Sequence, residues 1–209
     1  MGLLDILLPV PCARCGAPPR SPCSLCLARL NEAPRLPSPI GLESLTALTS
    51  YDDRSAVFIT DAKYRNSRSA LGVLAHWAVV QVPEEVRRDL EVVTWAPTTG
   101  ARRRERGFDQ AQLLARMVGR RLRLPVRGIL RRQDGPSQTG RSRADRLGGP
   151  RFRAQDAPER VLVVDDVCTT GATLRAAAWA LHQSGAHHVH GLVLARTPDP
   201  GGDRADRRR

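Results

Sequence analysis

The chain has 209 residues, 41% of them hydrophobic, and 33 Lys and Arg stand against 21 Asp and Glu to give a net charge of +12. This composition supports one ordinary core and excludes global disorder, and no apolar run reaches the roughly 18 residues of a membrane-spanning helix. The excess of positive charge predicts affinity for polyanions such as nucleic acid, phosphates or an anionic membrane surface.

The first 39 residues are rich in Pro and poor in periodic apolar residues, so this segment cannot form a core of its own. Residues 2–10 lack the basic start and the small-residue cleavage site of a signal peptide. We therefore expect a protein of the cytoplasm, in which thiols stay reduced.

Four of the five cysteines lie in this segment as two closely spaced pairs, Cys12-x-x-Cys15 and Cys23-x-x-Cys26. Two such pairs can direct four thiolates to one tetrahedral zinc site. The alternatives are two disulfides, which a reducing compartment disfavours, or a redox pair, which seldom occurs doubled. We predict a structural zinc module over residues 1–39, with no open ligand position for catalysis.

Beyond residue 39, strand and helix patterns alternate along the chain. Strands are predicted at 42–51, 90–96, 126–130, 161–164 and 189–195. Helices are predicted over most of 57–80, over 109–122 and over 173–184. This alternation predicts an α/β domain over 40–197, with a mostly parallel sheet flanked by helices. Residues 198–209, rich in Gly, Pro, Asp and Arg, are expected to be a disordered tail.

Two polar stretches, 98–107 and 133–150, interrupt the pattern, and the second has the length and composition of a mobile functional loop. The positive charge is concentrated around them, because residues 102–153 contain sixteen Arg and four acids, an excess equal to the net charge of the chain. Lys63 is the only lysine, so nearly all of the basic residues are arginines. The codon bias of a GC-rich genome explains this preference for Arg as well as binding of a polyanion does.

The segment 161–173 reads VLVVDDVCTTGAT: an apolar strand that ends in two acids, a loop with hydroxyls and Gly, and the start of a helix. Loop N–H groups and a helix N-terminus can hold a phosphate, and the two carboxylates can bind sugar hydroxyls or orient a hydrated Mg²⁺. An ordinary capped turn would explain any one of these features. Their combination favours a phosphate site at the carboxyl end of a strand.

This segment resembles the phosphoribosyl-pyrophosphate (PRPP) binding motif of type I phosphoribosyltransferases. Further elements in the same order narrow the resemblance to the competence protein ComF family: the paired cysteines, Lys63-Tyr64-Arg65, Arg106-Gly107-Phe108-Asp109-Gln110, and the run Ser137-Gln138-Thr139-Gly140 with Ser142–Arg146. The resemblance extends from about residue 5 to residue 197 and implies a type I phosphoribosyltransferase-like fold.

The resemblance also implies a site. Asp165 and Asp166 would meet the ribose hydroxyls, and the 5′-phosphate would be held by Thr169, Thr170, Gly171, Ala172 and Thr173. The pyrophosphate loop and the loop that closes over the site would contribute Lys63, Thr98, Thr99, Gln138, Arg143 and Arg146, with Mg²⁺ accompanying PRPP.

This chain departs from the family pattern at two places. Asp109 stands where the family usually has Asn, which exchanges a donor and acceptor for a group that only accepts. The run after Arg146 is shortened to Leu147-Gly148-Gly149-Pro150 before Arg151 and Phe152, which alters the closing loop. Both changes bear on catalysis more than on phosphate binding.

The arginine cluster admits three interpretations: a grip on pyrophosphate, a contact with a nucleic-acid backbone, or a solvated loop. Arginines spaced along the helix at 109–122 repel one another unless an anion lies among them, which favours a large anionic partner. Aromatic residues make up only 4% of the chain, so salt-sensitive backbone contact rather than extensive base stacking is expected. The candidate nucleic-acid contacts are Arg102, Arg103, Arg104, Arg106, Arg120, Arg121 and Arg123.

The family resemblance implies a role in natural transformation and DNA uptake. In that role the protein would bind PRPP or a related sugar phosphate and would handle incoming single-stranded DNA in the cytoplasm, with the competence helicase and other transformation proteins as partners. The alternative is an active phosphoribosyltransferase that acts on an unidentified nitrogen acceptor, although no base-reading motif is recognisable in the chain.

Overall fold

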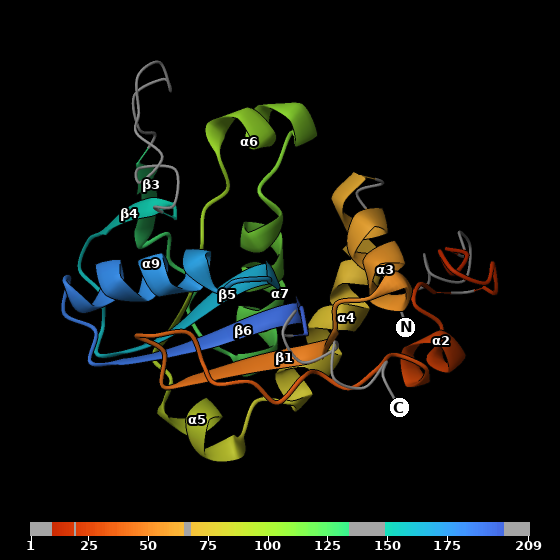
Figure 1. Cartoon of the computed structure of the whole chain (residues 1–209), viewed down its shortest axis with the longest axis horizontal. Coiled ribbons are helices and arrows are strands. Elements are labelled where there is room, and N and C mark those ends of the chain that lie inside the picture. Colours follow the sequence, from red (N-terminus) through yellow and green to blue (C-terminus); the bar gives the residue numbers. More distant parts are fainter. Residues whose placement is uncertain (1–9, 19, 65–67, 134–148, 199–209) are drawn as a thin grey trace, which may run out of the picture.

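The computed structural model describes residues 10–18, 20–64, 68–133 and 149–198 (Figure 1). Its centre is a parallel sheet of four strands in the order β1 (Ser44–Ser50), β6 (His188–Arg196), β5 (Arg160–Cys168) and β2 (Val92–Trp95). The inner strands β5 and β6 are largely apolar and buried on both faces, as parallel sheets require, whereas the edge strand β1 is mostly half-buried. The predicted α/β domain with a mostly parallel sheet is therefore confirmed.

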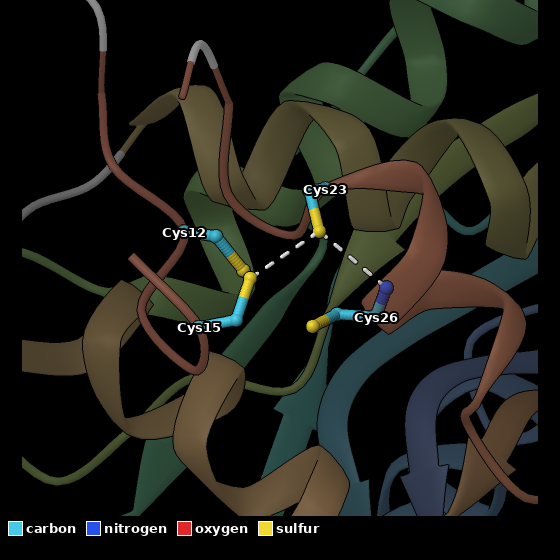
Figure 2. Close-up of side chains that lie close together, drawn as sticks. All are labelled: Cys12, Cys15, Cys23 and Cys26. Carbon is cyan, nitrogen blue, oxygen red and sulfur yellow. Dashed lines mark hydrogen bonds between the residues drawn. The ribbon is translucent and has the colours of Figure 1, made fainter. Parts of the chain in front are cut away.

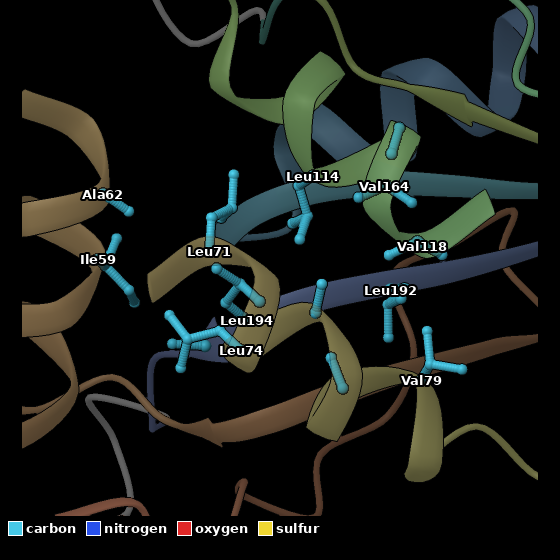
Figure 3. Packing of buried hydrophobic residues seen from close by; sticks show 14 of the residues in the cluster. Ile59, Ala62, Leu71, Leu74, Val79, Leu114, Val118, Val164, Leu192 and Leu194 are labelled. Carbon is cyan, nitrogen blue, oxygen red and sulfur yellow. The ribbon is translucent and has the colours of Figure 1, made fainter. Parts of the chain in front are cut away.

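Helices cover both faces of the sheet, and the alternation of side chains along each strand divides the core in two. In β5, Leu162 and Val164 pack with α4 (Arg68–Val80) and α7 (Gln110–Leu122), as Figure 3 shows for Val164. Val161 and Val163 point the other way, into the cluster under α9 (Ala172–His182). These valines and leucines are 0–1% exposed, so β5 is the central strand of a three-layer domain.

The remaining elements lie around these layers. They are α2 (Ser24–Ala28), α3 (Asp53–Tyr64), α5 (Glu84–Asp89), α6 (Gly100–Arg106) and an antiparallel ribbon of β3 (Leu130–Gln133) with β4 (Arg151–Ala154). In Figure 1 both α6 and the ribbon project upward from the sheet, α6 at the top centre and the ribbon above α9. No helix in the described part of the chain is long and apolar enough to cross a membrane.

Three elements differ from the sequence prediction. The polar stretch 98–107 contains α6, which forms because the Thr99 side chain caps the Arg102 N–H and Gly107 ends the helix at φ 76°. The predicted helix 57–80 is two helices, α3 and α4. The strand predicted at 126–130 begins only at Leu130, where it pairs with β4, which was not predicted.

The strand predicted at 161–164 extends to Cys168 in the structure, and the extra residues include the two acids of the site. β5 continues through Asp165 and Asp166 to Cys168, because β6 runs beside it as far as the pair Cys168 and Arg196. On the other side its partner β2 stops at Trp95, opposite Val164. The two acids therefore lie within β5, on an edge that β2 leaves open.

The cysteine-bearing segment packs onto the main core. Cys12, Cys23 and Cys26 are buried in the same cluster as Phe58 and Leu71 from α3 and α4. The division into units at 1–39, 40–197 and 198–209 stays a prediction, and most of the last unit lies outside the described residues.

Candidate functional site

A polar cavity of about 230 Å³ lies where β2 and β5 separate. Asp165 and Asp166 come from β5, Thr169 from the loop after it, and Thr173 from the first turn of α9. The opposite wall is formed by Thr98 and Arg102, from the loop after β2 and the first turn of α6, with Asp109 and Gln110 at the start of α7. The structure thus brings predicted ribose, phosphate and pyrophosphate residues to one cavity at the carboxyl edge of the sheet, where open α/β sheets bind ligands.

The two acids of β5 are half-buried and shape the backbone that follows them. Oδ1 of Asp165 accepts the N–H of Asp166 at 2.8 Å, and Oδ1 of Asp166 accepts the N–H of Val167 at 2.8 Å. Each carboxylate lines the cavity as well. Carboxylates in this setting can accept hydrogen bonds from sugar hydroxyls or orient the water shell of Mg²⁺.

The loop between β5 and α9, where the sequence predicts the phosphate-binding turn, is tightly folded. Thr169 and Thr170 are exposed, and Gly171 caps α9 with φ 73°, a left-handed conformation that disfavours other residues. A Cβ at Gly171 would lie 2.8 Å from Cγ of Pro39, so the segment before β1 fits closely against this turn. Ala172 follows as the first residue of α9, whose N-terminal N–H groups face the same loop.

Asp109 and Gln110 occupy buried positions beside the cavity. Asp109, 6% exposed, caps α7 by accepting the Gln112 N–H at 3.3 Å, and its other oxygen accepts the Thr98 N–H at 3.0 Å. Gln110 is 4% exposed, and neither its amide oxygen nor its amide nitrogen has a hydrogen-bond partner among the described residues. A buried amide left in that state costs about 1–3 kcal/mol, which a ligand or water would offset.

One cavity residue was missed by sequence reasoning. Arg132 comes from β3 and lines the cavity, donates to the carbonyl of Pro97 at 3.4 Å, and lies 5.6 Å from the centre of the Phe152 ring. With Arg102 it gives the cavity a second guanidinium. No local signal marks it, because its position depends on the pairing of β3 with β4, on the far side of residues 134–148.

The fold separates the arginines that were predicted to contact nucleic acid. Arg102, Arg103 and Arg104 lie on α6, where Arg102 lines the cavity and the other two are exposed. Arg120, Arg121 and Arg123 lie at the opposite end of α7, whose 13 residues span about 20 Å. Arg121 also contacts the protein itself, since its Nη1 lies 2.9 Å from Nδ1 of His76. The two groups cannot form one compact patch.

Several predicted site residues cannot be placed. Gln138, Arg143 and Arg146 lie outside the described residues. Lys63 and Arg106 belong to α3 and α6, but their side chains are outside the described part of the structure. Thr99 acts as the cap of α6, with Oγ1 accepting the Arg102 N–H at 3.3 Å.

The four N-terminal cysteines converge on one point (Figure 2). All their sulfur atoms lie within 4.8 Å of one another, and those of Cys15 and Cys23 are 3.6 Å apart. Tetrahedral zinc with Zn–S bonds of about 2.3 Å places its sulfurs about 3.8 Å apart. None of the five cysteines forms a disulfide. The cluster therefore has the ligand type, number and spacing of a closed metal site, and zinc fits it.

The local fold explains this convergence. Cys23 caps α2, with its sulfur accepting the Cys26 N–H at 3.5 Å, which folds the second pair back on itself. Burial raises the pKa of Cys12, but backbone N–H groups of Cys23, Cys15 and Arg14 outweigh it and lower the pKa to about 6. Burial raises the pKa of Cys26 to about 12, and the other sulfurs act in the same direction. Four thiolates can therefore coexist here only with a cation among them.

A chain of contacts links the cysteine segment to the phosphate turn. Arg196, 8% exposed at the end of β6, donates to the carbonyls of Leu36 at 2.9 Å and Pro37 at 2.5 Å. Pro39, two residues further on, packs against Gly171. Cys168 lies beneath the turn, where burial raises the pKa of its thiol. Cys168 is thus a buried packing residue at this point of the fold.

Comparison with known proteins finds similarity for slightly less than half of the chain. A family model described as phosphoribosyl transferase domain matches residues 109–207. Competence protein ComFC of Streptococcus pneumoniae (strain ATCC BAA-255 / R6) is 29% identical over 104 residues, which cover 48% of this chain and 46% of that protein. The matched part thus spans less than half the length of the curated relative.

Three solved structures are similar to the chain at low identity. The allosteric regulatory enzyme of purine biosynthesis has a TM-score of 0.42 and 21% identity, covering 60% of this chain and 25% of that one. A purine phosphoribosyltransferase from Pyrococcus horikoshii Ot3 has a TM-score of 0.39 and 20% identity, covering 60% and 75%. An orotate phosphoribosyltransferase from Aeropyrum pernix has a TM-score of 0.43 and 23% identity, covering 68% of each chain.

The matched model spans α7, the ribbon, β5, α9 and β6, which hold most of the cavity. Its match and the parallel sheet flanked by helices define a type I phosphoribosyltransferase-like domain, as the sequence predicts. With the four-cysteine cluster ahead of this domain, the chain resembles competence protein ComFC, to which about half of it is similar.

Proposed function

We propose that this ComFC-like protein binds PRPP, or a related sugar phosphate, in the cavity between β2 and β5, and that it handles incoming single-stranded DNA during natural transformation. The observation that carries the proposal is the meeting of two carboxylates, Asp165 and Asp166, with the hydroxyls of Thr169 and Thr173 and the guanidinium of Arg102 around one cavity. These are the groups that a phosphorylated ribose requires.

Each part of such a ligand has a matching group. The carboxylates of β5 suit the ribose hydroxyls or the water shell of Mg²⁺. The turn at Gly171 and the N-terminus of α9 suit the 5′-phosphate. Arg102 and Arg132 would offset the charge of the pyrophosphate from the opposite wall. Mg²⁺ bound with the ligand would supply further charge neutralisation.

Handling of DNA is supported by the exposed arginines beside the cavity. Arg103 and Arg104 are solvent-exposed on α6, next to Arg102. They can contact a phosphate backbone while Arg102 faces the cavity. The resemblance to ComFC supports the further proposal that this activity takes place in the cytoplasm with a competence helicase among the partners. Zinc bound by the four cysteines would order the segment that leads to Pro39.

Calorimetry with PRPP and Mg²⁺ tests the sugar-phosphate site. We expect saturable binding that is lost in the D165N/D166N double variant and kept in D156N, because Asp156 is exposed and outside the cavity at a φ of 49° that Asn tolerates. Equal binding by the double variant would refute the proposed site.

A salt titration tests the DNA part separately. Affinity for a single-stranded oligonucleotide should fall as salt rises, and more weakly in an R103E/R104E variant that has lost two phosphate contacts. An affinity that neither salt nor this charge reversal changes would refute backbone contact at α6.

A second function, phosphoribosyl transfer to a nitrogen acceptor, is favoured by the match to the phosphoribosyl transferase domain, which includes Asp165 and Asp166. In that case Mg²⁺ would stabilise the leaving pyrophosphate. Release of pyrophosphate on addition of a nucleobase, abolished in D165N, would establish it. Binding of PRPP without such release across the common nucleobases would favour the binding protein.

A further inference from the structure

A second concave surface lies on α9, outside the phosphate cavity. It encloses about 570 Å³, within the range of roughly 300–1,000 Å³ of small-molecule sites, and is bounded by α9, β4 and the segment before β1. Figure 1 shows α9 and β4 side by side. Its floor is apolar, with Phe152, Ala172 and Ala176, and Ile40 stands at its edge. We call this surface the α9 groove.

Trp179 forms one wall of the α9 groove and is 68% exposed. Leu174, Ala177 and Leu181 of α9 are buried against the sheet, while Arg175 and Trp179, four residues apart, share its outward face. The chain has only eight aromatic residues in 209. An indole left open above an apolar floor marks a binding surface, because burying it would stabilise the protein.

The charges around the α9 groove have one sign. Among the described residues, its charged side chains other than histidine are Arg151 and Arg175, both exposed, and none is an acid. Arg153, two residues along β4 and therefore on the same face as Arg151, is paired in register with Arg131 of β3. Like charges placed opposite each other in a sheet repel, and this pair lines a separate hollow of the ribbon, so it favours an anion that continues along the ribbon from Arg151.

These features select an occupant that is flat, apolar and joined to phosphates. We propose that the α9 groove binds a nucleobase of single-stranded nucleic acid, which stacks on Trp179 while the adjoining phosphates contact Arg151 and Arg175. The inference rests on the DNA handling proposed above and gives it a surface distinct from α6. It adds one stacked base to the salt-sensitive backbone contact that the scarcity of aromatic residues predicts.

Other occupants fit less well. A second copy related by a two-fold axis through the α9 groove would bring Arg151 and Arg175 against the same arginines of its partner. A duplex keeps its bases stacked inside and offers no free face to Trp179. An acidic, aromatic peptide also matches the charge of Arg151 and Arg175, so the test below includes it as a contrary outcome.

The test is fluorescence anisotropy with a labelled single-stranded oligonucleotide at moderate salt. W179A should weaken binding about 5- to 150-fold, the range for removal of one base stack, and W179F should keep most of the affinity. The matched control is W77A, since Trp77 is 42% exposed on α4 and lies outside the α9 groove. An abasic strand of the same length should bind wild type and W179A alike.

The outcomes separate this inference from the proposed function. If wild type binds the oligonucleotide and folded W179A binds it equally well, the α9 groove is not the stacking site, although the DNA proposal survives. If W179A instead changes the oligomeric state or the binding of an acidic peptide, the groove is a protein interface and the inference is wrong. Calorimetry with PRPP on W179A should be unchanged, because Trp179 does not line the phosphate cavity.

Discussion

Oδ2 of Asp109 accepts the backbone N–H of Thr98 at 3.0 Å and so ties the start of α7 to the loop that follows β2. Its Oδ1 accepts the Gln112 N–H, so both carboxylate oxygens are used. The family that the chain resembles usually has Asn here, which offers one oxygen only. The aspartate therefore holds the predicted pyrophosphate loop against the start of α7 and uses the Thr98 N–H that could otherwise bind a phosphate oxygen. It also adds a negative charge to the cavity that Arg102 lines.

D109N should raise the affinity for pyrophosphate. Asn still caps α7 but releases the Thr98 N–H for a phosphate oxygen, and it removes one repulsive charge from the cavity. We expect a loss of stability of about 1 kcal/mol for D109N, and of about 2 kcal/mol for D109A, which loses both hydrogen bonds. Calorimetry and urea unfolding measure these effects. Weaker pyrophosphate binding by D109N than by wild type would contradict this account.

G171A should both destabilise the protein and weaken binding of sugar phosphate. The left-handed φ of 73° strains any residue with a Cβ, and the new methyl group would lie 2.8 Å from Cγ of Pro39. The control is G16A, which has the same φ of 73° but no atom within 4 Å of the added Cβ. We expect backbone strain to lower the free energy of unfolding by about 1 kcal/mol in both variants, and the Pro39 contact to lower it further in G171A. The affinity for PRPP should fall in G171A alone. Equal effects would show that the Pro39 contact is unimportant.

The parts of this site that sequence could predict are contiguous in the chain. The run from Val161 to Thr173 carries its strand, acids and turn together, and the cysteine pairs define their own cluster by spacing. Arg132 and Trp179 could not be found in this way. The first depends on the pairing of β3 with β4, and the exposure of the second depends on how α9 packs beside that ribbon. α6 was missed because a run of arginines has no apolar period, and its helix depends on a cap at each end.

R196M should loosen the segment between the cysteine cluster and β1. The Arg196 guanidinium is buried and supplies the donors for the carbonyls of Leu36 and Pro37. Loss of these donors leaves the two carbonyls without hydrogen bonds and lowers the free energy of unfolding by about 1–3 kcal/mol. R175M, an exposed arginine on α9, is the control and should be nearly neutral for stability. Thermal unfolding and proteolysis between residues 31 and 40 measure the effect. Unchanged proteolysis in R196M would show that Arg196 does not hold this segment in place.

Acid should weaken the attachment of the cysteine segment at Asp52. Burial raises the pKa of Asp52, but N–H groups of Ser55 and Arg54 and the amide of Asn31 outweigh it, and the net pKa is lowered. A carboxyl whose pKa is lower in the folded state stabilises the protein above its unfolded pKa of about 4, and this contribution disappears as pH falls through the folded value. The stability difference between wild type and D52N should therefore shrink in acid. A difference that stays constant from pH 7 to pH 3 would contradict this.

Removal of the metal should unfold the cysteine segment while the parallel sheet stays folded. We expect one zinc per chain by metal analysis, lost in C26S, because a closed four-sulfur shell cannot spare a ligand. Zinc affinity should fall as pH falls, since thiolates must be deprotonated to bind, and the high pKa of Cys26 makes its proton the costliest to release. C168S is the control, because Cys168 lies in the other core cluster and should leave zinc content unchanged.

Because Pro39 packs against Gly171, chelation should also lower PRPP affinity in wild type. A folded chain that carries no zinc would contradict the metal site. PRPP binding that chelation leaves unchanged would contradict the link between the metal site and the phosphate turn.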